Sequence, residues 1–137
     1  MTKDDIFRFL NANPVFQLAT CEGTTPHVRS LMLHKADETG IYFMVGKFKD
    51  IYMQLSVNPQ VELCFHTNDL QIRISGESEK LDKDPELKQE IIDARPYLKE
   101  LIDVFGLKYI AVFRVKNAVA TVWSLQTEMQ PKEYIPL

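Results

Sequence analysis

Short apolar or alternating segments, most of them separated by turn residues, run through this 137-residue chain and restrict it to a fold rich in strands. Residues 61–66 alternate apolar and polar side chains, the period of a half-buried strand, whereas residues 41–45 are apolar throughout and are expected to be covered on both faces. Seven segments fit strands: residues 15–21, 27–33, 41–45, 61–66, 71–75, 109–115 and 118–123. With so many strands and short turns, we predict a mainly β fold, a closed antiparallel barrel with helical insertions.

The turns between these segments predict how the strands connect. Residues 22–25 join the first two strands as a hairpin, and the third strand follows consecutively, so we expect three antiparallel neighbours. Lys116 and Asn117 separate the last two strand segments by the spacing of a tight hairpin. The chain shows no linker, internal repeat or low-complexity tract, so residues 1–137 are expected to form a single domain.

Helix signals occur at a few places only. Thr2 and Asp5 have the spacing of a capping box and precede an apolar stripe, which predicts a first helix that ends before Pro14. Asp84 is a suitable N-cap before a proline at the first helical position, and Pro96 ends that helix. A further helix is expected to run on to Gly106.

Composition narrows the classes of partner. The net charge is −3 with basic residues scattered along the chain, so there is no basic stripe for nucleic acid. No apolar stretch approaches the ~20 residues of a membrane-spanning helix, and the acidic start does not fit a secretory signal. We therefore expect a cytoplasmic protein that binds neither nucleic acid nor membrane. Cys21 and Cys64 are expected to be reduced thiols in the core. His27, His34 and His66 lack ligand spacing, so no metal site is predicted.

The segment 46–59 is the strongest candidate for a binding site. Lys47 and Lys49 lie where the chain leaves the apolar strand 41–45 and enters a short helix. Their ammonium groups, together with the first free N–H groups of that helix, would suit a phosphate. The alternative is that both lysines are solvated loop charges, because lysines are common at strand-to-helix junctions.

The order and separation of four segments resemble the pyridoxamine 5′-phosphate oxidase-like family, the split barrels that bind flavin mononucleotide (FMN). The segments are residues 27–33, residues 41–45 leading to Lys49, residues 54–59 and residues 71–76. Within that family the short chain is most similar to the small Nim-type flavoproteins, named for nitroimidazole reduction. The resemblance implies an antiparallel split β-barrel of Greek-key type and a homodimer with one FMN in each cleft between subunits.

The same resemblance assigns roles to individual residues. It implies that Arg29 and Lys49 bind the FMN phosphate, with Lys47 as a third partner. The backbone of Ser30, Leu31 and Met32 would then contact the polar edge of the flavin ring. Gln54, Gln71 and Trp123 complete the expected set, with Gln71 reaching the cofactor through its amide. Alternatives remain: a cross-strand ion pair for Arg29, a solvent-facing Gln71, and a core or interface anchor for Trp123, which we favour over direct flavin contact.

The chain departs from the oxidase itself after Trp123. The oxidase has an arginine and a histidine there that hold the vitamin, whereas residues 124–131 contain neither. His34 also stands where the oxidase has a lysine. We therefore expect no pyridoxamine phosphate oxidation, but an FMN-dependent oxidoreductase that passes electrons from a reduced donor to a small aromatic or quinone-like acceptor. The alternative is a non-catalytic module that binds flavin, haem or another planar ligand; the sequence does not separate FMN from a deazaflavin.

Overall fold

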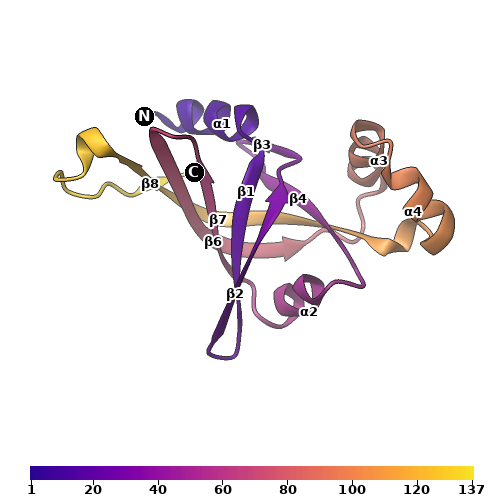
Figure 1. The fold of residues 1–137 in the computed structure, drawn as a ribbon. Helices are drawn as coiled ribbons and strands as arrows, with labels where there is room; N and C mark the ends of the chain where they lie inside the picture. The colour runs from indigo at the N-terminus through magenta and orange to yellow at the C-terminus, as the bar shows by residue number, and fades with distance from the viewer.

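The computed structural model describes residues 1–137 as one curved antiparallel sheet with four α-helices around it (Figure 1). The strands are β1 (Val15–Glu22), β2 (Thr25–Met32), β3 (Lys35–Asp37), β4 (Gly40–Gly46), β5 (Gln60–His66), β6 (Leu70–Lys80), β7 (Ile110–Ser124) and β8 (Ile135–Pro136). The helices are α1 (Lys3–Ala12), α2 (Asp50–Val57), α3 (Pro85–Ala94) and α4 (Leu98–Phe105), with 3₁₀ turns η1 (Leu107–Tyr109) and η2 (Leu125–Thr127). Figure 1 shows α3 and α4 projecting beyond one end of β7, and residues 125–134 beyond the other.

The strands follow the order β2-β1-β5-β6-β7-β4-β3, with β8 added to β7, and every pairing is antiparallel. The prediction of a mainly β split barrel is confirmed. The prediction of full closure is wrong, because β2 and β3 lie at the two ends of the order and do not pair with each other. The three early segments are also not all neighbours: β1 pairs with β2, but β4 pairs with β7 on the far side of the sheet.

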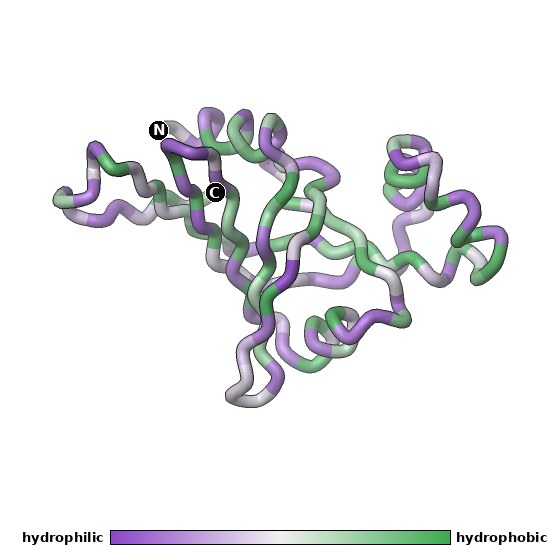
Figure 2. Tube along the Cα trace, in the orientation of Figure 1, coloured by the Kyte–Doolittle hydropathy of each residue, from purple (hydrophilic) through white to green (hydrophobic).

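Period-two alternation places the core on the inner face of the sheet. In β1, Phe16 and Leu18 are fully buried, and in β5 Phe65 stacks on Phe16 with ring centroids 4.9 Å apart. Phe43 of β4 stacks on Phe113 of β7 at 5.8 Å. Burial alternates accordingly along β1 and β5, and Figure 2 shows hydrophobic and hydrophilic residues interspersed along the sheet. All residues of strand β4 are buried except Gly40 and Met44, which are half-buried, as expected for a segment that is apolar throughout.

The predicted hairpin at Lys116 and Asn117 is wrong, because β7 runs through both residues without reversing. Between the pairs Ser75–Val119 and Glu77–Lys116, β7 has one residue more than β6, which makes a β-bulge. Asn117 takes the left-handed conformation there, with φ 52°. Here the turn-forming residues mark a bulge and not a turn. The segments of β7 on both sides of them pair with the same strand, β6.

The two cysteines do not belong to the core. Cys21 is exposed, and Cys64 is half-buried. The outward orientation of both cysteines follows from the alternation of side chains along a strand, because their neighbours Thr20 and Leu63 point inward. Strands β3 and β8 were not expected from the sequence, because three and two residues are too few for a periodic pattern.

The predicted helices form. The Thr2 hydroxyl accepts from Asp5 N at 3.1 Å and the Asp5 carboxylate accepts from Thr2 N at 2.8 Å, so the capping box starts α1. Helix α3 starts after the Asp84 cap, and α4 ends at Phe105, with Gly106 as its C-cap. These two helices pack against the sheet in a second apolar cluster that includes Ile91 and Val112. None of the helices has the length and apolar character needed to span a membrane.

Candidate functional site

A cavity of about 510 Å³ opens where β2, the end of β4 and the start of α2 meet. This size is typical of small-molecule sites. Residues of all three elements form its wall: His27, Val28, Arg29, Ser30, Leu31, Met44, Val45, Gly46, Lys49, Asp50 and Ile51. Four residues predicted for the flavin, Arg29, Ser30, Leu31 and Lys49, are therefore in one place although twenty positions of sequence separate the first from the last.

Alternation along β2 decides which of its side chains face inward. Arg29 pairs with Leu18 of β1 and is half-buried, as is Leu31. Ser30 and Met32 are exposed on the opposite face, where the amide of Gln17 is 3.4 Å from the Ser30 hydroxyl. Of the three residues predicted to contact the flavin ring, Ser30 and Leu31 border the cavity, whereas Met32 does not.

A buried hydrogen-bond network holds the Arg29 guanidinium. Its Nη1 donates to Thr20 Oγ1 at 2.7 Å, and its Nη2 donates to Gln54 Oε1. The Thr20 hydroxyl also donates to Gln54 Oε1, at 2.7 Å. Thr20 and Gln54 are only 1% and 4% exposed. Burial lowers the pKa of Arg29, and the carboxylate of Asp50 opposes that shift. Hydrogen bonds to Thr20 and Gln54 therefore fix the position of the guanidinium.

The start of α2 supplies the rest of the basic wall. Lys49 is the N-cap residue, and no side chain caps the helix, so its first N–H groups have no side-chain acceptor. Asp50 also lines the cavity, which places one carboxylate beside the two cations. Lys47 is elsewhere: its Nζ lies 5.9 Å from the ring centroid of Tyr52 and it does not line the cavity.

Gln71 and Trp123 lie on a different part of the sheet. They are direct cross-strand partners on β6 and β7 and line a separate hollow of about 260 Å³ together with Arg73. Trp123 is 42% exposed, so it is not a core residue of the single chain, and its indole N–H donates to Glu128. Within one chain, these two predicted residues do not share the cavity that contains Arg29.

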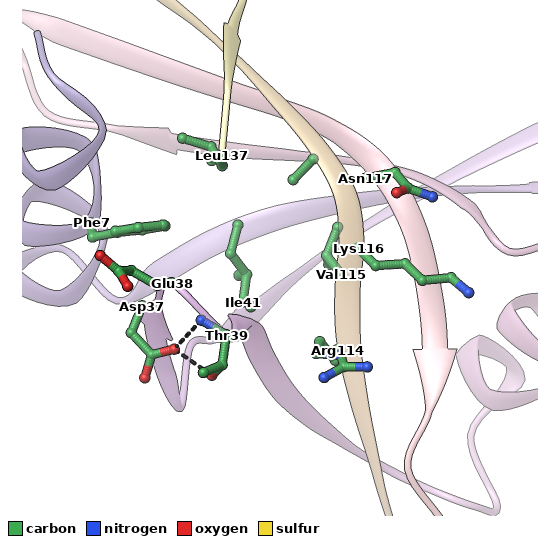
Figure 3. Close-up of a pocket in the computed structure, with 12 residues that line it drawn as sticks. Phe7, Asp37, Glu38, Thr39, Ile41, Arg114, Val115, Lys116, Asn117 and Leu137 are labelled. Atoms are coloured by element: carbon green, nitrogen blue, oxygen red, sulfur yellow. Dashed lines mark hydrogen bonds between the residues drawn. The ribbon is translucent and has the colours of Figure 1, made fainter.

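A third hollow, of about 170 Å³, lies between the β3–β4 turn and the bulge of β7 (Figure 3). Asp37 accepts there from the backbone N–H of Thr39 at 2.8 Å, which closes the turn, and Arg114 and Lys116 project from β7. None of the predicted flavin residues is among its walls. The charges of both signs are on exposed or half-buried side chains, so this hollow is a surface feature of the turn.

Sequence reasoning missed one acidic residue of the cavity wall, Asp50, and two residues that lie behind it, Thr20 and Tyr109. Thr20 follows Phe16 and Leu18 in the inward row of β1, so a polar residue at a core position was the available signal. Asp50 was not assigned a role, and Tyr109 packs on Gly46 without any sequence pattern that links them. The structure contains no group of three or more His, Cys, Asp or Glu side chains that could hold a metal ion.

Comparison with known proteins decides the family. The family model of pyridoxamine 5′-phosphate oxidase matches residues 2–122, most of the chain. The chain belongs to the pyridoxamine 5′-phosphate oxidase-like family. This is the FMN-binding split-barrel family that the four segments resembled. A search of curated proteins finds no match.

Solved structures of the pyridoxamine 5′-phosphate oxidase-like fold agree. A NimC/NimA family protein from Clostridium acetobutylicum is 28% identical, with a TM-score of 0.79 over 98% of this chain and 92% of that chain. A pyridoxamine 5′-phosphate oxidase-related, FMN-binding protein from Nostoc punctiforme is 16% identical, with a TM-score of 0.65 over 98% and 95%. A FAD-binding protein from Mesorhizobium loti is 18% identical, with a TM-score of 0.65 over 90% and 96%. The last two similarities show the fold alone.

The residues of the first cavity fit a flavin phosphate. A guanidinium held by two buried partners, an ammonium and an uncapped helix start all border one space. A doubly charged phosphate needs such donors, and charge-assisted hydrogen bonds are the stronger kind. Arg29 and Lys49 would hold the phosphate, and the inward edge of β2 would lie beside the rest of the cofactor.

Proposed function

We propose that this protein is an FMN-dependent oxidoreductase that passes electrons from a reduced donor to a small aromatic or quinone-like acceptor. The observation that carries the proposal is the joint position of Arg29 and Lys49 on one cavity, at the uncapped start of α2, in a chain of an FMN-binding family. The flavin supplies the redox chemistry when bound. The chain itself binds the phosphate, orients the ring along β2 and limits the access of water.

The cofactor assignment is tested by the visible absorption spectrum of the purified protein after addition of FMN and removal of unbound ligand. Retained flavin bands are expected for the natural chain. The double variant Arg29→Ala with Lys49→Ala should lose them while its circular dichroism stays unchanged. A control with the same loss of charge, Lys3→Ala with Arg8→Ala on α1, should retain flavin. Normal flavin content in the first double variant overturns the phosphate assignment.

We further propose a homodimer in which Gln71 and Trp123 of one subunit complete the cavity of the other. The separation of these two residues from Arg29 within one chain supports the proposal, and so does the 42% exposure of the only tryptophan. A mixing experiment tests it. If each cleft takes residues from both subunits, co-expression of Arg29→Ala/Lys49→Ala with Gln71→Ala/Trp123→Ala should restore one intact site per heterodimer. No recovery of flavin binding in isolated heterodimers contradicts the shared cleft.

The second candidate function is a module that binds flavin or another planar ligand without turnover. The absence of arginine and histidine from residues 124–131 favours it, because nothing there replaces the groups that hold the oxidase substrate. Steady-state oxidation of a nicotinamide donor with a nitroaromatic or quinone acceptor separates the two functions. An oxidoreductase turns over many times, whereas a binding module gives at most one stoichiometric reduction of its ligand.

A further inference from the structure

Three aromatic rings from different segments form a cluster beside the proposed phosphate site. Phe48 comes from the connection between β4 and α2, Phe105 ends α4, and Tyr109 ends η1. Each pair of ring centroids is 5.3 Å apart. Phe48 meets Phe105 nearly at right angles, at 84°, so the three rings do not form one continuous stack.

This cluster and the cavity share a wall. Gly46 lines the cavity, and the Tyr109 ring packs directly on it, so that a Cβ at position 46 would lie 2.3 Å from the Tyr109 hydroxyl oxygen. The backbone N–H of Lys47 donates to the carbonyl of Tyr109 at 2.8 Å. Lys49 follows Phe48 by one residue and lines the cavity. The ring cluster therefore lies next to the cavity wall, with Gly46 between them.

The cluster is open to solvent, although its members are large and apolar. Phe48 is 73% exposed in spite of its two ring contacts, and Phe105 is 41% exposed. Val104 and Leu107, one and two positions from Phe105 in the chain, are also exposed, at 73% and 43%. A group of exposed apolar residues marks a binding site more often than an isolated exposed residue does.

Three lysines and two carboxylates, those of Asp50 and Asp103, lie within two positions of the ring residues in the chain. Lys47 and Lys49 flank Phe48 in the chain, and Lys108 immediately precedes Tyr109. A second copy of the chain docked here about a two-fold axis would bring two patches with an excess of lysine together, which is unfavourable. An anionic ligand with an aromatic ring suits the surface better, because its charge is opposite and its ring can stack.

We propose that this cluster is a subsite for the adenine ring of flavin adenine dinucleotide (FAD), with Phe48 as the stacking residue. The inference rests on the proposed function, since it takes the flavin phosphate to lie between Arg29 and Lys49. In FAD that phosphate continues through a second phosphate to adenosine. The chain has matching groups at adjacent positions, a cation at Lys49 in the cavity wall and an exposed ring at Phe48. The site accepts the dinucleotide as well as FMN.

The test compares the dissociation constants of FMN and FAD, measured by flavin fluorescence, for the natural chain and for Phe48→Ala. Stacking of one base on an aromatic side chain predicts a loss of about tenfold in FAD affinity, with FMN affinity changed less than about twofold. Phe48→Trp keeps a ring and should retain FAD, while Phe48→Leu, apolar without a ring, should behave as Phe48→Ala does. Because Phe48 is mostly exposed, these variants are expected to fold normally.

The other outcomes each decide against the proposal. An unchanged affinity for FAD in Phe48→Ala shows that the cluster does not hold adenine. An equal loss for FMN and FAD shows that Phe48 only supports the phosphate loop, and dissociation of a dimer in that variant shows a subunit contact. If the natural chain binds neither flavin, the proposed function itself fails. If it binds FMN and only the Phe48 effect is missing, the proposed function stands and the subsite is excluded.

Discussion

Gln54 on α2 and Thr20 on β1 meet 2.7 Å apart, and the Gln54 oxygen that accepts from the Thr20 hydroxyl also accepts from Arg29. One amide oxygen thus joins a helix, an inner strand and the edge strand β2 below the proposed phosphate site. Since Thr20 and Gln54 are almost fully buried, the network fixes the guanidinium before any ligand arrives. A fixed cation loses less conformational freedom on binding than a mobile one.

Replacement of Gln54 separates its structural role from its electrostatic effect. Gln54→Leu leaves the Thr20 hydroxyl and the Arg29 guanidinium without their acceptor, so the free energy of unfolding should fall by about 1–3 kcal/mol. Gln54→Glu restores an acceptor but offsets the charge of Arg29, so stability should stay near that of the natural chain while FMN affinity falls about tenfold. Urea denaturation and flavin titration measure the two effects. Equal FMN affinities for Gln54→Glu and the natural chain would contradict a phosphate at Arg29.

Asp50 should oppose anion binding at the same place, because its carboxylate lines the cavity. Asp50→Asn is expected to raise FMN affinity by about threefold. It should also lower stability by about 0.5 kcal/mol, because a negative charge in the first turn of a helix is favourable. The matched control is Asp4→Asn in the first turn of α1, which should lower stability similarly and leave FMN affinity unchanged. A weaker affinity in Asp50→Asn counts against the assignment.

Arg95 should anchor the two projecting helices to the barrel. It is 9% exposed at the end of α3, and its Nη2 donates to the carbonyls of Met32 and Leu33 at 3.1 and 3.2 Å. Arg95→Met removes both hydrogen bonds from a charged donor and should cost about 2–3 kcal/mol in urea denaturation. Arg95→Lys keeps the charge and one donor group, so an intermediate loss is expected. Stability of Arg95→Met equal to that of the natural chain rules out the anchor.

His34 should make the protein less stable in mild acid. Its side chain is 7% exposed, Nε2 has no hydrogen-bond partner, and Glu90 Oε2 lies 3.5 Å away. Burial lowers the pKa of His34, with further lowering by the charges of Arg95 and Lys35, while Glu90 acts in the opposite direction. The unfolded chain therefore binds a proton on His34 at about pH 6.5, and the folded chain only at lower pH. Stability from this group is complete above that pH and declines as the pH falls below it.

The measurement for His34 is the melting temperature between pH 8 and pH 5, compared with that of His34→Asn. As the pH falls through about 6.5, the melting temperature of the natural chain should decrease more than that of the variant, because only the natural chain has a buried imidazole to protonate. Parallel curves over the whole range would show that His34 does not titrate differently in the folded state.

The bulge of β7 should depend on the left-handed conformation of Asn117. Asn117→Gly adopts a positive φ without steric cost and should leave stability unchanged or slightly altered. Asn117→Val is β-branched and should lower the free energy of unfolding by about 1–2 kcal/mol. Thermal denaturation checks both. Because Asn117 is exposed, a large effect of Asn117→Gly would point to a lost side-chain contact instead of strain.

Much of the fold was accessible from the sequence, because local signals and tertiary packing agree. The capping box at Thr2, the Asp84 cap and the alternation of residues 61–66 each predicted the element that forms. The signals failed where tertiary pairing overrides local preference. Lys116 and Asn117 have the chemistry of a turn, yet β6 pairs with the segments on both sides and keeps β7 continuous.

The sequence by itself determined the mainly β character, the helix starts and the set of residues proposed to bind the cofactor. Those properties depend on neighbours a few positions apart, through alternation, capping and charge. The tertiary structure alone decided which of those residues meet. It joined Arg29 and Lys49, set Gln54 behind Arg29, directed Lys47 toward Tyr52, and separated Gln71 and Trp123. Such distances follow from the pairing order of distant strands, and no local pattern encodes that order.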